Sequence, residues 1–533
     1  MALRPPLDID NDHHSAASTL VAPPAAQLPQ PYTVLNNPDK TWRDRLASWW
    51  LPYQLPLQDV AVPLTTATTT TTPLETVRTR ANQLFSTHVQ TVVSRWKQVA
   101  HCDIVETDYL VPRPENLLQG WGLADVASTP LFATKQSTMM TMTTTTMMMM
   151  EQQQHIRVTV LFPLSVLGSQ GAVASKVTDA GCLAVAWPSS TNLFACLPQT
   201  VPILLCFHGG GFVLGGSHHH NQHHHNNHQQ QQQVYQNDIM DMIAYLLEPD
   251  QRVAAGGGNG GGGGGGGGNL SFILACVDYS LAPEHPFPVA IEESLAVASH
   301  LSKHCANPLH VVGAAGAGAN LALVCALESY RRLQENNGHC YIQSALILSP
   351  MMDPAADSIS YYMNSQSTHI SVSWLRWCWQ AYLRLPASQD GAVPAENNQT
   401  NKRGNQDTAR VDSQTKLTSG SNRTTWDACV YRHTSAERLI HPTVDLPHGL
   451  DQPRAPEIVL VTNRADPLYD EGVALAHKLQ QAKAKLTHVD QKGSQYLGAY
   501  LDSKAFADVA AAWRNCKTLF ERKQPVAAVT NAV

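Results

Sequence analysis

The sequence has no run of roughly 18 uncharged apolar residues, the length needed to cross a membrane as a helix. Residues 1–30 also contain no apolar stretch preceded by basic residues, which is the pattern of a secretory signal. These two absences predict a protein with no transmembrane segment. We therefore expect a cytoplasmic protein.

Blocks of basic residues are also absent, and acidic and basic residues are interspersed along the chain. The formal net charge is −6. Such a surface offers no face that neutralises phosphates, which argues against nucleic acid as a partner. The 11 cysteines form no CxxC pair, and several lie inside apolar segments, where a thiol behaves as a small hydrophobic group. We expect reduced cysteines, no metal site and no cofactor.

Low-complexity tracts interrupt the chain and bury too little apolar surface to offset the loss of chain entropy. The tract at 218–233 is rich in histidine and glutamine, that at 256–268 is almost all glycine, and that at 388–423 is polar. We interpret all three as inserted loops; a histidine tract without fixed shape does not set metal-ligand geometry. The predicted organisation is an N-terminal helical and low-complexity region at 1–155, one main domain at 156–524 and a tail at 525–533.

The apolar pattern changes along the chain from helical to strand-and-helix. Spacings of three and four residues place one N-terminal group on a single helix face: Leu84, His88, Val92, Trp96 and Val99. We expect this face to pack in the core, with a lipid-surface anchor as the alternative. Farther on, short apolar runs alternate with helical segments, at 203–207, 272–278, 310–313, 345–348, 458–462 and 486–489. This alternation predicts an α/β fold whose mostly parallel sheet is covered by helices on both faces.

Two motifs follow two of these strands. Residues 208–212 read HGGGF, and the glycines free the backbone to turn sharply and direct amide groups at one point, as stabilisation of a tetrahedral oxyanion requires. Residues 278–288 read DYSLAPEHPFP. Together the motifs closely resemble those of the hormone-sensitive-lipase-like family of α/β-hydrolases (α/β-hydrolase fold-3). The motif residues are His208, Gly211, Phe212, Asp278, Tyr279 and Glu284.

The resemblance extends over roughly 201–522 and implies the fold of a serine esterase or lipase. It predicts an eight-stranded, mostly parallel sheet with a helical cap that includes 370–383. It also implies an oxyanion hole formed by the amides of Gly209, Gly210 and Ala317, and a triad whose serine, aspartate and histidine occur in that order. The aspartate matches Asp466, in the segment DPL.

The serine of the family's nucleophile turn has no counterpart. Aligned on the segment NLA at 320–322, the serine position falls on Gly316, and a shift of one residue places Ala315 or Ala317 there. No register supplies the hydroxyl or thiol that covalent catalysis needs.

The histidine is absent as well. After Asp466 only His477 and His488 remain, and both fall within predicted regular structure. Counting from Asp466 places Tyr496 at the histidine position, whereas matching the aromatic residue of the family's HGF turn places Ser494 there. Neither side chain accepts a proton near neutral pH as imidazole does.

These losses predict a pseudoenzyme whose pocket binds an acyl or lipid ligand or a protein partner. One alternative is an active ester hydrolase with another nucleophile, Cys325 or Ser349, although we expect neither to face the oxyanion donors. A second alternative is a nucleotide-binding protein, because the glycines at 313, 316 and 318 resemble a phosphate-binding turn.

Overall fold

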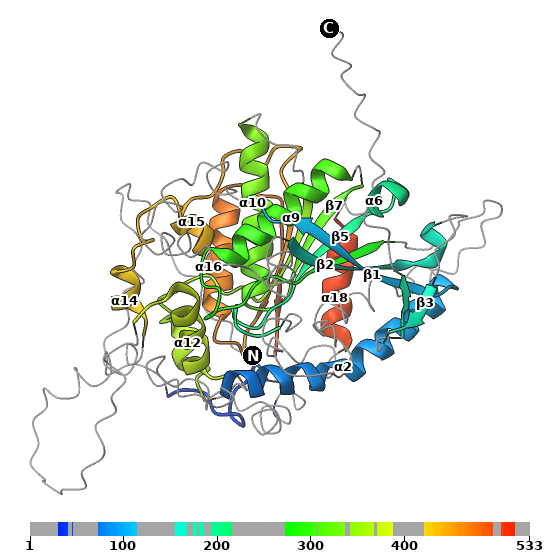
Figure 1. Cartoon of the computed structure of the whole chain (residues 1–533). Coiled ribbons are helices and arrows are strands. Elements are labelled where there is room, and N and C mark those ends of the chain that lie inside the picture. The colour runs from blue at the N-terminus through cyan, green and yellow to red at the C-terminus, as the bar shows by residue number, and fades with distance from the viewer. Residues whose placement is uncertain are drawn as a thin grey trace, which may run out of the picture.

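The structure of the chain, a computed structural model, places a large sheet at the centre of the molecule with helices on both sides (Figure 1). It describes residues 30–40, 45, 73–114, 155–167, 174–178, 181–185, 193–215, 272–305, 307–335, 342–366, 370–386, 421–493 and 503–516. The predicted loops at 218–233 and 256–268, most of the loop at 388–423 and the tail at 525–533 lie outside these residues.

Ten strands form one sheet in the order β10-β9-β8-β7-β5-β6-β2-β1-β4-β3. The strands are β1 (Ile104–Pro112), β2 (His155–Pro163), β3 (Ala174–Val177), β4 (Leu183–Val185), β5 (Ile203–Phe207), β6 (Ile273–Val277), β7 (Leu309–Gly313), β8 (Ile342–Leu348), β9 (Glu457–Asn463) and β10 (Leu486–Gln491). Neighbours from β10 to β6 run parallel, whereas β2 is antiparallel to both β6 and β1. Each of the six predicted apolar runs is a strand, since such runs suit a sheet buried on both faces.

The sheet has two strands more than the eight expected. The additional hairpin extends the β1 edge, where β4 pairs in parallel with β1 and β3 pairs antiparallel with β4. Its strands are only four and three residues long, too short for a periodic signal in the sequence.

Helices cover both faces of the sheet. They are α2 (Pro73–Ala100), α6 (Leu193–Cys196), α9 (Val289–His304), α10 (Ala317–Gln334), α11 (Ile359–Met363), α12 (Val372–Leu383), α14 (Arg423–Asp427), α15 (Glu437–Ile440), α16 (Tyr469–Gln481) and α18 (Ser503–Arg514), with 3-10 turns η5 (Leu164–Leu167) and η7 (Pro442–Val444). Helices α9, α10 and α16 share the larger core cluster with the cap helix α12. The second cluster joins the end of α2 to α18. Helix α14 begins at Arg423, the last residue of the predicted polar loop.

The predicted N-terminal helix is confirmed by α2, on which Val92 and Trp96 are buried in the second core cluster. However, β1 also lies within 1–155, the stretch expected to be helical, and it pairs with β2 over its whole length. The main domain therefore includes residues before 156. Long-range pairing across the ladder decides this segment, because β propensity depends strongly on tertiary context.

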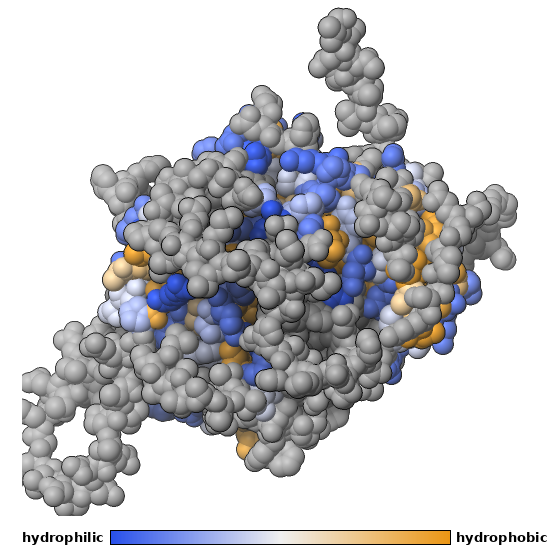
Figure 2. Space-filling view, viewed as in Figure 1, coloured by the Kyte–Doolittle hydropathy of each residue, from blue (hydrophilic) through white to orange (hydrophobic). Residues whose placement is uncertain are grey.

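Hydrophobic side chains reach the surface mainly as scattered residues. Figure 2 shows some of them near the β1 and β3 end of the sheet, where Leu110 and Val177 are exposed. Within the described part of the chain, no helix has the length and apolar character needed to cross a membrane.

Candidate functional site

The turn between strand β7 and helix α10 has Gly316 at its tip. Gly316 adopts φ 81° and ψ −110°, a conformation that costs a residue with a side chain about 1–3 kcal/mol. Its N–H donates to the carbonyl of Ser349 at 2.9 Å, and its carbonyl accepts from the N–H of Met351 at 3.2 Å. Neither Ala315 nor Ala317 has a positive φ. Because a nucleophile turn is strained at the nucleophile itself, this favours the alignment that places Gly316 at the serine position.

The other glycines of this turn allow helix α10 to pack closely on the sheet. A Cβ added to Gly313 would lie 2.4 Å from the Cα of Ala319. A Cβ added to Gly318 would lie 2.3 Å from the carbonyl oxygen of Phe207, at the end of β5. Packing therefore accounts for the glycine pattern that suggested a phosphate-binding turn.

Residues 208–212, which we call the glycine loop, leave the end of β5 beside this turn. Gly210 and Gly211 have φ of 102° and 64°, so the loop uses the left-handed region that glycine adopts without strain. A Cβ on Gly211 would lie 2.4 Å from the Sγ of Cys378 on the cap helix α12. The ring of Phe212 stacks on Tyr382 of α12 with centroids 3.8 Å apart. The loop is thus in direct contact with the cap.

The second motif supports the glycine loop from the opposite direction. The Tyr279 hydroxyl donates to the carbonyl of His208 at 2.7 Å, and the two rings stack with centroids 4.0 Å apart. The N–H of Ala282 donates to the carbonyl of Phe212 at 2.9 Å. Asp278 lies at the start of this motif, directly after β6. The two motifs therefore form one bonded unit.

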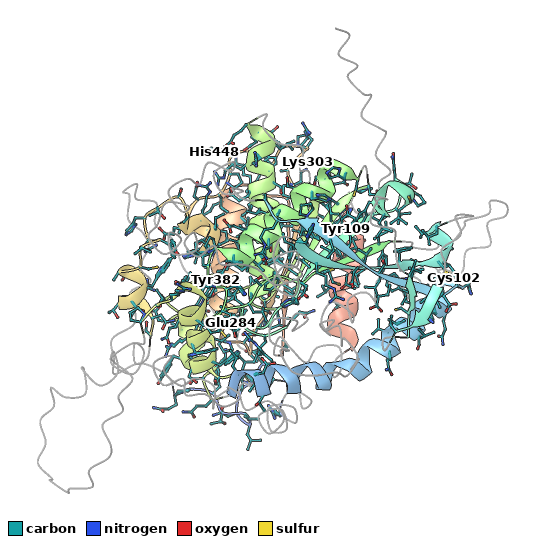
Figure 3. The ribbon with its side chains drawn as sticks, in the orientation of Figure 1. Cys102, Tyr109, Glu284, Lys303, Tyr382 and His448 are labelled. Atoms are coloured by element: carbon teal, nitrogen blue, oxygen red, sulfur yellow. The ribbon has the colours of Figure 1, made fainter. Side chains whose placement is uncertain are left out.

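Glu284 of the second motif binds a residue outside both motifs. Both of its carboxylate oxygens accept hydrogen bonds from the guanidinium of Arg78, on α2, at 2.9 and 3.0 Å. Burial raises the pKa of Glu284, but the hydrogen bonds and charge of Arg78 outweigh it, so the pKa is lowered overall. Figure 3 shows Glu284 and Tyr382 at the same end of the molecule, near the start of α2.

The predicted acid, Asp466, follows strand β9 at the same edge of the sheet and is buried. Its Oδ1 accepts the N–H of Leu468 at 2.9 Å, and its backbone carbonyl accepts from the Asn364 side chain at 3.0 Å. Ser349 connects this loop to the turn: its N–H donates to the carbonyl of Val461 of β9, and its carbonyl accepts from Gly316. The structure therefore brings Gly316 and the loop of Asp466 to one edge, on either side of β8.

The two candidate histidine positions, Ser494 and Tyr496, lie outside the described residues. Of the two histidines between Asp466 and residue 493, His477 is exposed on α16. His488 lies with its Nε2 2.9 Å from the Oγ1 of Thr462, and burial lowers its pKa. The contact of His488 is with Thr462 of β9 and not with the turn at Gly316.

The two substitute nucleophiles considered from the sequence also have defined environments. Cys325 is buried inside α10, and Ser349 is buried next to Gly316. The Ser349 hydroxyl accepts a hydrogen bond from the Asn463 side-chain amide. An amide donor occupies a lone pair of the oxygen and removes no proton, so this contact does not activate the hydroxyl.

Sequence reasoning missed Arg78 and Asn463. Arg78 is a single basic residue in an amphipathic helix, and nothing in its neighbours indicates a partner more than 130 residues away. Asn463 directly follows the predicted strand at 458–462, shortly before the DPL segment, and is the last residue of β9. Its position after a strand and before the predicted acid was the one available signal.

Comparison with known families agrees with this arrangement. Residues 268–399 match a family model described as alpha/beta hydrolase fold. This stretch includes the second motif, the turn at Gly316 and the cap helix α12. The chain has the α/β-hydrolase fold. This fold agrees with the parallel strands from β10 to β6 and with the antiparallel β2.

Solved esterases are similar to this α/β-hydrolase-fold protein at low sequence identity. An esterase from the fungus Rhizomucor miehei is 15% identical, with a TM-score of 0.45, and the match covers 90% of this chain and 99% of the esterase. A hyperthermophilic esterase from the archaeon Pyrobaculum calidifontis is 15% identical with a TM-score of 0.43, covering 87% and 98%. Esterase LipW from Mycobacterium marinum is 14% identical with a TM-score of 0.43, covering 87% and 96%. No curated protein is detectably similar in sequence.

Proposed function

We propose that this α/β-hydrolase-fold protein does not hydrolyse esters and uses its site to bind an acyl or lipid ligand. The observation that carries the proposal is Gly316: the turn has a positive φ at its tip, but the residue there has no side-chain oxygen or sulfur atom. In serine hydrolases, removal of the nucleophile or the base reduces turnover on the order of a millionfold. Rates at that level are negligible for an ester substrate.

The surroundings of the glycine loop support an apolar ligand. Phe212, Trp379 and Tyr382 form an aromatic group where the loop meets the cap. Amides of Gly209, Gly210 and Ala317 are the predicted donors to an acyl carbonyl or carboxylate oxygen beside these rings. A protein partner is the competing occupant, and the experiments below distinguish the two.

The first experiment measures hydrolysis of short-chain p-nitrophenyl esters and labelling by a fluorophosphonate. We expect neither with the unmodified protein, and recovery of labelling with Gly316→Ser plus Tyr496→His. The matched control, Gly316→Ala plus Tyr496→His, places a side chain at the same strained position without a nucleophile and should remain unlabelled. Turnover or labelling of the unmodified protein well above background would overturn the proposal and direct attention to Ser349.

The second experiment tests the ligand class. Trp374, Trp377 and Trp379 all lie on α12, so a brominated fatty acid bound at the glycine loop should quench tryptophan fluorescence saturably. A non-brominated fatty acid of the same length should compete and reverse the quenching. Absence of saturable quenching would exclude an acyl ligand and leave a protein partner.

A further inference from the structure

Arg78, in the second turn of helix α2, makes contacts that join three segments of the chain. Its side chain is buried, and Nε donates to the carbonyl of Val213 at 2.8 Å. Nη2 donates to the carbonyl of Ala282 at 2.9 Å, and Nη1 and Nη2 bind the two oxygens of Glu284. One planar guanidinium thus bridges the end of the glycine loop and the second motif.

One of the two bridged carbonyls, that of Val213, belongs to the turn that shapes the glycine loop. Val213 directly follows Phe212, and the N–H groups of Val213 and Leu214 both donate to the carbonyl of Gly210, at 3.1 and 2.9 Å. Because Arg78 binds the Val213 carbonyl, it connects this turn to helix α2. A lysine would retain the charge opposite Glu284, but its single ammonium lacks the planar fork that reaches two carbonyls and a carboxylate.

The rest of α2 determines where Arg78 lies. Val77, beside it, is buried in the larger core cluster, whereas Val93 and Trp96 are buried in the second cluster. Trp96 stacks on Phe272, before β6, with centroids 4.9 Å apart. The helix runs along the molecule from the cap toward the β1 edge of the sheet (Figure 1). It is therefore fixed by packing at both ends.

We propose that Arg78 is a positioning residue for the glycine loop, and that α2 through Arg78 sets the geometry in which the amides of Gly209 and Gly210 meet a ligand. The ligand part rests on the proposed function, whereas the positioning of the loop does not. A buried charge paired on several sides is costly to break, because removing one partner leaves the others unsatisfied. The loop should consequently lose its fixed shape when the guanidinium is removed.

The test is amide hydrogen exchange of the apo protein, followed in peptides that cover 207–215. Arg78→Met, which keeps the apolar stem, should speed exchange there by about tenfold, the equivalent of about 1.4 kcal/mol. Arg78→Lys should restore part of the protection through Glu284. The control is Arg438→Met, since Arg438, on α15, forms a hydrogen-bonded ion pair with Glu328 of α10, with side chains 14% and 4% exposed. It should leave exchange in 207–215 unchanged.

Exchange in Arg78→Met that equals the unmodified protein, or that rises equally in all peptides, would overturn the proposal. If Arg78→Met does not fold, Glu284→Gln provides the same test, because it weakens only one of the three contacts. It should raise exchange in 207–215 by a smaller factor, and no local rise would again refute positioning. Since no ligand is present, failure of the acyl-binding proposal leaves this result intact.

Discussion

Gly316 lies at the tip of the turn between β7 and α10. The turn requires a positive φ at its tip, and glycine meets that requirement without the strain that a serine would add. Glycine at this position therefore provides no side-chain oxygen and leaves the backbone of the turn unstrained. Packing of α10 on β7 and β5 depends instead on Gly313 and Gly318.

Glu471 is a second residue whose environment has a measurable consequence. It is buried on α16, and its Oε2 accepts the N–H groups of Met352 and Asp353 at 2.6 and 3.0 Å. Burial, followed by the charge of Asp353, raises its pKa to about 8. The folded protein thus retains a proton that the unfolded chain releases near the ordinary glutamate pKa.

This raised pKa predicts a loss of stability with rising pH. The stabilisation is fully present below the ordinary glutamate pKa and is lost as the pH rises through about 8. Between pH 6 and 9 the contribution of Glu471 to the free energy of unfolding should fall by about 3 kcal/mol. Urea unfolding at both pH values should show this fall, and Glu471→Gln should reduce it. A control, Glu335→Gln at the exposed end of α10, should retain it; an undiminished fall in Glu471→Gln would contradict the assignment.

At the scale of elements, helix α10 depends on how closely it approaches β5. Gly318 lies in its first turn, and a Cβ there would meet the carbonyl oxygens of Phe207 and His208 at 2.3 and 2.5 Å. Both are backbone atoms, so the helix itself has to move to accept a side chain.

Gly318→Ala should therefore destabilise the protein by about 1–3 kcal/mol. Helix propensity alone predicts the opposite sign, because alanine favours a helix over glycine by about 1 kcal/mol. Chemical denaturation distinguishes the two. Gly181→Ala is a useful comparison, since the φ of Gly181 is +82° and no atom lies within 4 Å of the added Cβ. The loss of stability in that variant measures backbone strain alone, without a steric clash. A stabilised Gly318→Ala variant would show that α10 does not pack against β5 as described.

For the whole molecule, two core clusters lie on the sheet and share its strands. Leu346 and Ile347, consecutive on β8, belong to different clusters because successive side chains of a strand point to opposite faces. We therefore expect the two clusters to unfold together.

Paired substitutions test this cooperativity. Ile104→Val in the second cluster and Ile458→Val in the larger one should each cost about 1 kcal/mol. In the double variant the losses should add to within about 0.5 kcal/mol. Circular dichroism and tryptophan fluorescence should report one common transition. Two separate transitions, each shifted by only one substitution, would show that the clusters are independent.

Much of this architecture was predictable from the sequence, and particular residues show where prediction ended. The runs at 203–207 and 458–462 are strands because continuous apolar segments of that length suit a buried parallel sheet. The strand β1 was missed because its identity depends on pairing with β2. The motif at 208–212 was recognised from its glycines, whereas its contact with Cys378 of the cap was not.

The sequence by itself determined which chemical groups are available: three glycines after β5, only glycine and alanine in the turn after β7, and an aspartate after β9. Composition and local periodicity suffice for these conclusions, because they depend on residue type and on neighbours within one element. Only the tertiary structure decided that Gly316 has the positive φ of the turn, that Ser349 joins it to β9, and that Arg78 reaches the glycine loop. Those contacts join residues far apart in the chain, and they follow from how helices and strands pack together, which no local pattern encodes.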